Sequence, residues 1–258
     1  MTTTAFEPRI HPAGQHVFEL QWSRPPNNFI DAELVRGIAQ ALETLDQEPD
    51  CRAVVLAPEG KHFCGGANLA GRDRSRDTDA AGSLYAEAVR LFRTTKPIVA
   101  AVQGGAIGGG LGLALAADFR VVADDVRMSA NFSQLGYYPG FGLTATLPRL
   151  IGAQQTALLL YTGRRIKADE ALKIGLAEQV VPRAELGRAS LDFAAEIATS
   201  APLSVLAIRA RLRGSLAQTV IDALAIESAE QGRLRKTSDF VEGVKAGAER
   251  RPPVFGGT

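Results

Sequence analysis

The sequence is poor in cysteine, with only Cys51 and Cys64 among its 258 residues. Two cysteines cannot supply the disulfide framework on which small secreted domains rely. The first ten residues, MTTTAFEPRI, also lack the basic end and the apolar run of a secretory signal. These features predict a protein of the reducing cytoplasm.

The sequence also has no excess of charge of either sign. Lys and Arg number 29, Asp and Glu number 28, and the formal net charge is +1. Such a balance creates no overall field that would attract a polyanion such as nucleic acid. Long apolar runs are missing too, because the stretch at residues 97–117 contains Gln103 and many glycines, whereas a membrane span needs roughly 20 apolar residues. We therefore expect neither nucleic acid nor a membrane as a partner.

Hydrophobic periodicity predicts a layered α/β arrangement in the first half of the chain. Residues 17–22 alternate like a half-buried strand, Asp31 can cap a helix that runs to Leu45, and the apolar run at 53–57 is typical of a strand buried on both faces. The repeated order of strand and helix favours right-handed crossovers. The further elements expected here are a helix at 80–93, a strand at 98–102, a short helix at 111–117 and a strand at 119–123.

The second half of the chain is predicted to be mostly helical. From Leu143 onward we expect a single strand, at residues 178–181. The predicted helices cover residues 143–150, 154–161, 168–174, 185–200, 203–212 and 220–235.

A glycine-rich turn carries the first sign of chemistry. Residues 96–110, KPIVAAVQGGAIGGG, place a strand, a turn and a helix start in succession. Free backbone N–H groups and a helix N-terminus then meet where negative charge can sit. The turn has no Gly-Lys-Ser/Thr and does not fit the dinucleotide fingerprint, which disfavours a P-loop protein or a nucleotide-dependent oxidoreductase. A thioester enolate is the other natural occupant.

A second loop of small residues offers another backbone donor. Residues 60–69, GKHFCGGANL, follow the buried strand at 53–57. Two N–H groups that converge on one carbonyl oxygen form an oxyanion hole, in which one donor is typically worth about 3 to 4 kcal/mol of transition-state stabilisation.

These two segments, with PGFGLTATLPRLIG at 139–152 and TGRRI at 162–166, resemble the crotonase superfamily, the enoyl-CoA hydratase/isomerase family. The resemblance extends over residues 17–251. It implies an α/β fold built as a spiral of ββα units in residues 1–195, followed by a helical trimerisation region in residues 196–258. A homotrimer, or a hexamer formed as a dimer of trimers, is therefore expected.

The same resemblance implies the ligand and its contacts. The substrate would be an acyl-CoA, with CoA as part of the thioester, no separate cofactor and no metal. The two oxyanion donors would be the backbone N–H groups of Ala67 and Gly109. CoA would lie along Arg24 and a loop that contributes Cys64, Ala67, Asn68 and Leu69. Lys245, Arg250 and Arg251 would either bind its phosphates or form an exposed basic helix end.

The sequence departs from the family pattern at the acidic residues. Family hydratases carry two glutamates at positions that are here Gly112 and Phe132, and several related isomerases and dehalogenases carry an aspartate where this chain has Gly140. A positioned acid or base contributes about 10²- to 10⁴-fold in rate, so hydration is disfavoured. Isomerisation, hydrolysis or other thioester chemistry remains open, as does the alternative of a non-catalytic acyl-CoA-binding homologue.

Another side chain would then have to move the proton. Tyr137 and Glu87 are possible proton carriers, or walls of the acyl pocket. Tyr85 and Glu87 cannot both face the pocket, because residues two apart on a helix diverge. Cys64 beside the oxyanion loop could be a nucleophile, although packing is the simpler role for a small thiol without a base. The remaining candidates are Tyr138 and His62.

Overall fold

Two β-sheets organise the chain. The computed structural model describes residues 6–68 and 80–258, and its larger sheet has six strands in the order β1-β2-β3-β4-β6-β9. The β1 and β2 strands pair antiparallel, and all other neighbours in this sheet are parallel. The strands are β1 (Arg9–Gly14), β2 (Val17–Gln21), β3 (Ala53–Leu56), β4 (Ile98–Val102), β6 (Phe119–Ala123) and β9 (Gln179–Val181).

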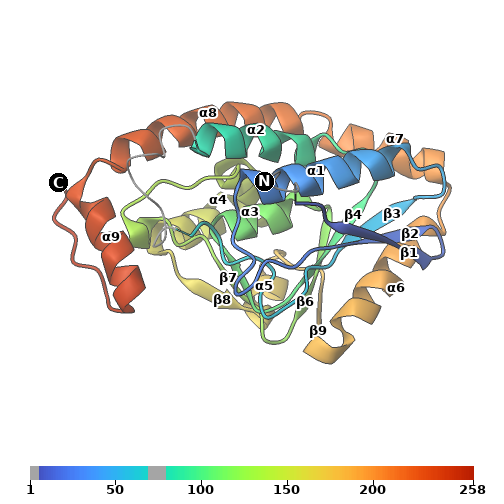
Figure 1. Cartoon of the computed structure of the whole chain (residues 1–258), viewed down its shortest axis with the longest axis horizontal. Coiled ribbons are helices and arrows are strands. Elements are labelled where there is room, and N and C mark those ends of the chain that lie inside the picture. Colours follow the sequence, from blue (N-terminus) through green and yellow to red (C-terminus); the bar gives the residue numbers. More distant parts are fainter. Residues whose placement is uncertain (1–5, 69–79) are drawn as a thin grey trace, which may run out of the picture.

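The central strands are buried on both faces, as their apolar runs predict. Alternate residues of β3 and β4 point to opposite faces, so Val54 and Ala100 join one core cluster while Val55 and Val99 join the other. The helix α6 (Leu186–Ala198) packs on the second of these faces, and the α1 helix (Ala32–Gln47) belongs to the first cluster. Figure 1 shows α1, α2 (Ala80–Phe92) and α8 (Leu216–Leu234) running along one side of the molecule, with α6 on the other side of the large sheet.

The helices confirm most of the sequence prediction. Asp31 caps α1, because its carboxylate accepts a hydrogen bond from the Leu34 N–H at 2.8 Å. The two helices predicted around residue 152 are confirmed as the halves of α4, which is interrupted by the non-helical φ of 74° at Gly152. The other helices are α3 (Gly109–Ala116), α4 (Leu143–Thr162), α5 (Ala168–Lys173), α7 (Pro202–Arg213) and α9 (Ser238–Glu249), with 3₁₀ turns η1 (Ser133–Leu135) and η2 (Arg183–Glu185).

Four strands and one helix of the described residues were not predicted. The prediction of a single strand after Leu143 is wrong, because β8 (Arg165–Lys167) pairs with β7 (Arg127–Ser129), which pairs with β5 (Gly105–Ile107) in a second sheet. Three-residue strands are too short to show a period of two. The edge strand β1 contains a proline, which weakens the strand signal, and the α9 helix contains two glycines, which lower helix propensity.

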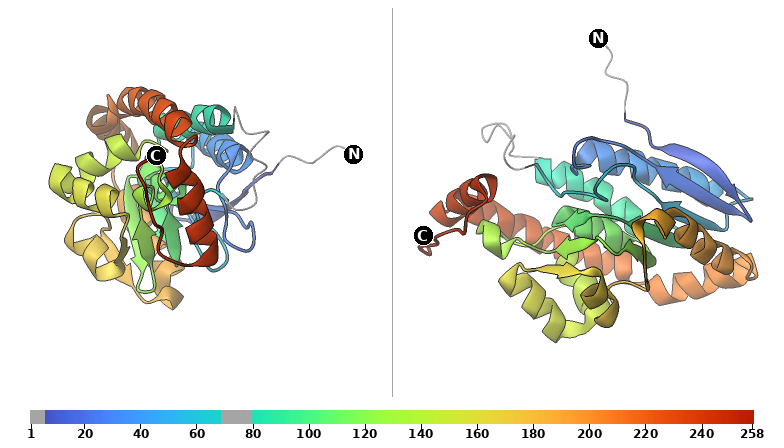
Figure 2. Two further views of the ribbon diagram at one scale, coloured as in Figure 1. Left: turned by 90° about the vertical axis from the view of Figure 1, so that its left-hand side faces the viewer. Right: turned by 90° about the horizontal axis from the view of Figure 1, so that it is seen from below.

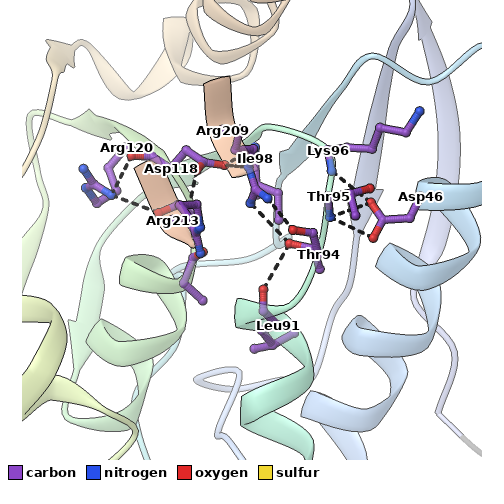
Figure 3. A network of polar contacts seen from close by, with 12 residues as sticks. Asp46, Leu91, Thr94, Thr95, Lys96, Ile98, Asp118, Arg120, Arg209 and Arg213 are labelled. Atoms are coloured by element: carbon purple, nitrogen blue, oxygen red, sulfur yellow. Dashed lines mark hydrogen bonds and ion pairs between the residues drawn. The ribbon is translucent and has the colours of Figure 1, made fainter. Parts of the chain in front are cut away.

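A buried ionic network fixes the α7 helix to the large sheet (Figure 3). The Asp118 carboxylate accepts hydrogen bonds from the Ile98 N–H at 2.8 Å, from Arg209 Nε at 2.9 Å and from Arg213 Nη1 at 2.8 Å. Both arginines belong to α7, and Arg209 also reaches the Thr94 carbonyl. The α7 helix is therefore tied to the sheet, and the predicted boundary between residues 195 and 196 falls inside α6.

Figure 2 shows α9 and the C-terminal segment packed at one end of the molecule, beyond α8. Within residues 6–68 and 80–258, no single helix combines the length and the apolar character required to cross a bilayer. Residues 183–198 and 202–234 pass that test only when they are joined across a bend of 102°.

Candidate functional site

A cavity of about 120 Å³ opens between the two glycine-rich segments. Residues 65–67 line it from one segment and residues 107–109 from the other. A backbone bridge holds the segments together, because the Cys64 N–H donates to the Gly105 carbonyl at 3.0 Å and the Ile107 N–H donates to the Cys64 carbonyl at 3.1 Å. The structure therefore brings Ala67 and Gly109, far apart in the sequence, to the same cavity.

The backbone at these two residues is shaped by glycine. Gly66 has a φ of 81°, and a Cβ atom there would lie 2.6 Å from the Ile107 carbonyl oxygen. Gly108 has a φ of 54° and precedes the first residue of α3. Gly109 thus occupies a helix start, where N–H groups have no intrahelical acceptor. Within the described residues, the N–H groups of Ala67 and Gly109 donate no hydrogen bond to the protein.

Aromatic and amide groups fill the positions of the family's acids. A Cβ at Gly112 would lie 2.7 Å from Phe141 Cβ and 2.8 Å from Phe141 Cδ1, and the Phe141 ring is almost completely buried. Phe132 lines the cavity, and a Cβ at Gly140 would meet the Tyr85 hydroxyl and lie 2.5 Å from Gln231 Nε2. No carboxylate or imidazole is present among the described residues that line the cavity.

One wall of the cavity is polar. It consists of Tyr85, Tyr137, Gln231 and Arg235, which we call the polar wall. The Tyr85 and Tyr137 hydroxyls donate to Gln231 Oε1 at 2.7 and 3.2 Å, and Arg235 Nη2 donates to the Tyr137 oxygen at 2.9 Å. Sequence reasoning missed Gln231 and Arg235. Their spacing of four on α8 places them on one helix face, but that signal alone does not say which face meets the cavity.

The two candidate proton carriers lie in different places. Tyr137 lines the cavity, and the Phe240 ring of α9 packs on its ring at a centroid distance of 4.7 Å. Glu87 does not line the cavity; it pairs with Arg36 at 2.8 Å and with Arg90 at 2.5 Å. Burial raises the pKa of Glu87, but the hydrogen bonds from these two arginines outweigh it and leave the pKa below its ordinary value. The structure therefore brings Tyr137, and not Glu87, to the site.

The other candidates are placed as follows. Burial raises the pKa of the Cys64 thiol to about 12, so this group stays protonated and is unsuited to nucleophilic attack. His62 accepts a hydrogen bond from the Gly105 N–H at Nδ1 and lines a neighbouring cleft. Tyr138 does not line the cavity and uses its carbonyl to accept a hydrogen bond from Gln231.

The residues predicted to hold CoA are divided between several environments. Arg24 forms ion pairs with Asp31 at 2.6 Å and Glu33 at 3.6 Å, and it lies over the Phe6 ring. Asn68 follows the cavity-lining loop and is exposed, whereas Leu69 lies outside the described residues.

A larger cleft of about 960 Å³ adjoins the cavity and shares Gly65, Ile107, Asn131 and Leu135 with it. Its lining is rich in positive charge. Lys61 comes from the segment at residues 60–69, and Arg250 and Arg251 directly follow α9. Lys245 does not line the cleft. The other cations of this lining are Arg127 and Arg165, and the lining also includes Asp125.

Comparison with known proteins identifies the family. Residues 13–258 match the family model for enoyl-CoA hydratase/isomerase. Carnitinyl-CoA dehydratase of Proteus mirabilis (strain HI4320) is 32% identical over 248 residues, which cover 93% of this chain and 95% of that protein. The crystal structure of an enoyl-CoA hydratase/isomerase from Pseudoalteromonas atlantica T6c superposes with a TM-score of 0.85 at 28% identity, covering 97% of this chain and 100% of the other. The protein EchA1_1 of Mycobacterium paratuberculosis has a TM-score of 0.82 at 30% identity and matches 97% of this chain and 98% of its own. The chain therefore belongs to the enoyl-CoA hydratase/isomerase family and has the crotonase fold.

Proposed function

We propose that this protein is an acyl-CoA enzyme in which the N–H groups of Ala67 and Gly109 bind the thioester oxygen and stabilise the enolate that forms from it. The observation that carries the proposal is the cavity that both residues line, with neither amide used by the described residues. Fixed backbone donors act strongly in such a site because they need no reorganisation as negative charge develops.

The reaction that follows is proposed to proceed without a carboxylate from residues 6–68 and 80–258. At two of the three positions where related proteins carry an acid, this chain has Gly112 and Gly140. Phe141 leaves no space for a side chain at Gly112, and Tyr85 and Gln231 leave none at Gly140. The third position is occupied by Phe132 itself. Hydration that depends on paired glutamates is therefore not supported, and proton transfer within a bound thioester, as in double-bond isomerisation, fits the cavity better. Tyr137 is the proposed proton carrier.

The CoA moiety is proposed to lie in the adjoining basic cleft. Lys61 and Arg250 line that cleft, and their positive charges suit the phosphates of CoA. Arg251 lines it too, although its guanidinium pairs with Glu242. This arrangement supports the phosphate-binding alternative for the C-terminal basic residues over that of a purely exposed helix end.

Association into a homotrimer or hexamer is also proposed. The α7 helix leaves large apolar side chains uncovered, since Leu203, Ile208 and Leu212 are 80%, 56% and 66% exposed. Ile208 and Leu212 share one helix face, and apolar surface of this kind commonly marks a contact with another chain. Cytoplasmic localisation is proposed with it, because the thiols of Cys51 and Cys64 are unpaired.

A second candidate function is binding without catalysis. Phe132, which stands at one acid position, and Phe141, which fills the space beside another at Gly112, favour this function. A site that polarises the carbonyl without an efficient proton carrier binds a thioester and releases it unchanged. Turnover distinguishes the two candidates.

The decisive experiment compares Gly109→Pro with Gly109→Ala. Both variants add a Cβ atom that would lie 3.2 Å from Ile30 Cγ2, but only proline deletes the N–H donor. Proline is tolerated at the first position of a helix. Wild-type protein and both variants are incubated with enoyl-, dienoyl-, aryl- and β-keto-acyl-CoA thioesters, and thermal-shift binding is recorded for each.

We expect Gly109→Pro to lose about 10²- to 10³-fold in turnover relative to Gly109→Ala. Equal turnover by the two folded variants would refute the oxyanion role of this amide. Stabilisation of the wild-type protein by several thioesters without any product would instead establish the binding protein.

A further inference from the structure

The orientation of the Gln231 amide is determined by its neighbours. Its Nε2 atom donates to the Tyr138 carbonyl at 3.0 Å and to the Pro139 carbonyl at 3.2 Å. Turning the amide over would place Oε1 against these two carbonyl oxygens, so the observed orientation is the favourable one. Both N–H groups are then used, and Oε1 is left to accept hydrogen bonds from the two tyrosine hydroxyls.

The two tyrosines are held differently by this amide oxygen. Tyr85 is the closer donor, at 2.7 Å, and burial raises its pKa, so it keeps its proton and fixes the amide. Tyr137 is at 3.2 Å, which is a longer and weaker hydrogen bond. Of the two hydroxyl protons, the one on Tyr137 is therefore the easier to redirect toward a group in the cavity.

Arg235 acts on the other side of the Tyr137 oxygen. Its Nη2 atom donates to that oxygen at 2.9 Å, and its guanidinium carbon lies 5.8 Å from the centroid of the Tyr137 ring. A positive charge hydrogen-bonded to an oxygen favours negative charge there. Arg235 is thus in place to support a phenolate when the proton leaves.

We infer that Gln231 and Arg235 are positioning residues that make the Tyr137 hydroxyl the proton carrier of this cavity, with Gln231 directing the proton and Arg235 stabilising the phenolate. The inference rests on the proposed function, because it assigns a proton carrier to the enolate formed there. Both residues belong to α8, and each forms a hydrogen bond with the Tyr137 hydroxyl group.

The proton-transfer step is balanced without a further reagent. The Tyr137 phenolate takes a proton from the carbon next to the thioester carbonyl, so that a C–H bond breaks and an O–H bond forms. The C–H electron pair moves toward the carbonyl and gives the enolate held by the two amides. In the reverse step, the hydroxyl returns its proton to an enolate carbon and becomes a phenolate beside Arg235.

Deuterium exchange measures this step without knowledge of the natural substrate. Butyryl-CoA is incubated with the 258-residue chain in deuterium oxide, and uptake of deuterium next to the carbonyl is followed by mass spectrometry. Phenols ionise at alkaline pH and carboxylic acids near pH 4. A tyrosine base therefore gives exchange that rises between about pH 6 and about pH 9, whereas a carboxylate base gives exchange that stays level over that range.

Four variants distinguish an effect on the Tyr137 hydroxyl from a general disturbance of the α8 helix. Tyr137→Phe should abolish the pH-dependent exchange. Arg235→Met should lower it about 10- to 100-fold at saturating thioester while thermal-shift binding of butyryl-CoA is unchanged, and Arg235→Lys, which restores the charge, should recover part of the rate. Arg233→Met is the matched control, because Arg233 lies on the same helix, is exposed and pairs with Glu230.

The outcomes for the inference and for the proposed function are distinct. Wild-type exchange that survives in both Tyr137→Phe and Arg235→Met but is lost in Gly109→Pro would overturn the inference and leave the oxyanion site intact. Exchange that survives in Gly109→Pro would instead count against the oxyanion site. Bound butyryl-CoA that exchanges at no pH with the wild-type protein would also overturn the inference.

Discussion

Replacing Gly112 with alanine tests whether the position of the missing family acid is physically closed. Gly112 lies inside α3, where a Cβ atom would lie 2.7 Å from Phe141 Cβ and 2.8 Å from Phe141 Cδ1. Neither atom is the far end of a flexible side chain, and the ring is 1% exposed. The backbone or the ring must therefore shift to admit even one methyl group.

The expected change in the free energy of unfolding is the difference between two opposing effects of the added methyl group. Alanine is favoured over glycine inside a helix by about 1 kcal/mol, while overpacking a filled core costs about 1 to 3 kcal/mol. Because two atoms near the base of a buried ring are involved, we take the upper end of the cost. The free energy of unfolding should then fall by about 2 kcal/mol, which corresponds to a decrease of about 4 to 8 °C in melting temperature for a chain of this size.

The matched control is Gly232→Ala. Gly232 also lies inside a helix, α8, but a Cβ atom there would have no neighbour within 4 Å. This substitution should stabilise the protein by up to about 1 kcal/mol. Denaturant unfolding followed by circular dichroism, at one protein concentration so that association is held constant, measures both variants.

A Gly112→Ala protein that is as stable as Gly232→Ala would refute the reasoning. It would mean that Phe141 yields at little cost and that the space beside position 112 is available to a larger side chain. Repeating Gly112→Ala in a Phe141→Ala background provides a second check, because the destabilisation should vanish when the ring is absent.

Two further substitutions test polar side chains that accept hydrogen bonds from the backbone. Glu227 is fully buried and accepts hydrogen bonds from two backbone N–H groups at the start of α4 and from the Thr144 hydroxyl. Glu227→Gln places an NH₂ group against a donor and should lower the free energy of unfolding by about 1 to 3 kcal/mol. An unchanged midpoint in denaturant unfolding would contradict this. Burial and two neighbouring cations lower the pKa of His62, whose Nδ1 accepts from the Gly105 N–H at 2.9 Å. The unfolded chain binds this proton more readily, so the contribution to stability is complete above the unfolded pKa of about 6.5 and is lost as the pH falls through the lower folded pKa. His62→Gln should flatten this part of the stability profile measured by thermal unfolding, and an identical slope in both proteins would exclude His62 as its source.

The sequence predicted the elements whose pattern is local. The strands Ile98–Val102 and Phe119–Ala123 were predicted with the bounds that the structure shows, because each is a short, largely apolar run between two turns. The α9 helix was missed, although Thr237 accepts a hydrogen bond from the Phe240 N–H at its start and a capping threonine could have signalled it. Short strands such as β8 exist only through their partners, so no local pattern announces them.

Only part of the candidate site was predicted from the sequence. The resemblance to the crotonase superfamily implied Ala67 and Gly109 as the oxyanion donors, and both residues line one cavity in the structure. The polar wall could not be predicted, because Gln231 reaches Tyr85 only through the packing of α8 on α2. Likewise, nothing in the sequence says that the ring of Phe141 fills the space beside Gly112.

The two backbone amides of the cavity and the side chains of the polar wall differ in how easily a mutation can remove them. The amides of residues 67 and 109 belong to the main chain, so most single-codon changes there leave an N–H group in place, while Gly66 and Gly108 hold backbone conformations that other residues rarely adopt. Each member of the polar wall, by contrast, can be altered by one replacement. Related proteins that diverge from this one are expected to keep the hydrogen bonds to the ligand's carbonyl oxygen. They are expected to differ in their contacts with the rest of the bound molecule.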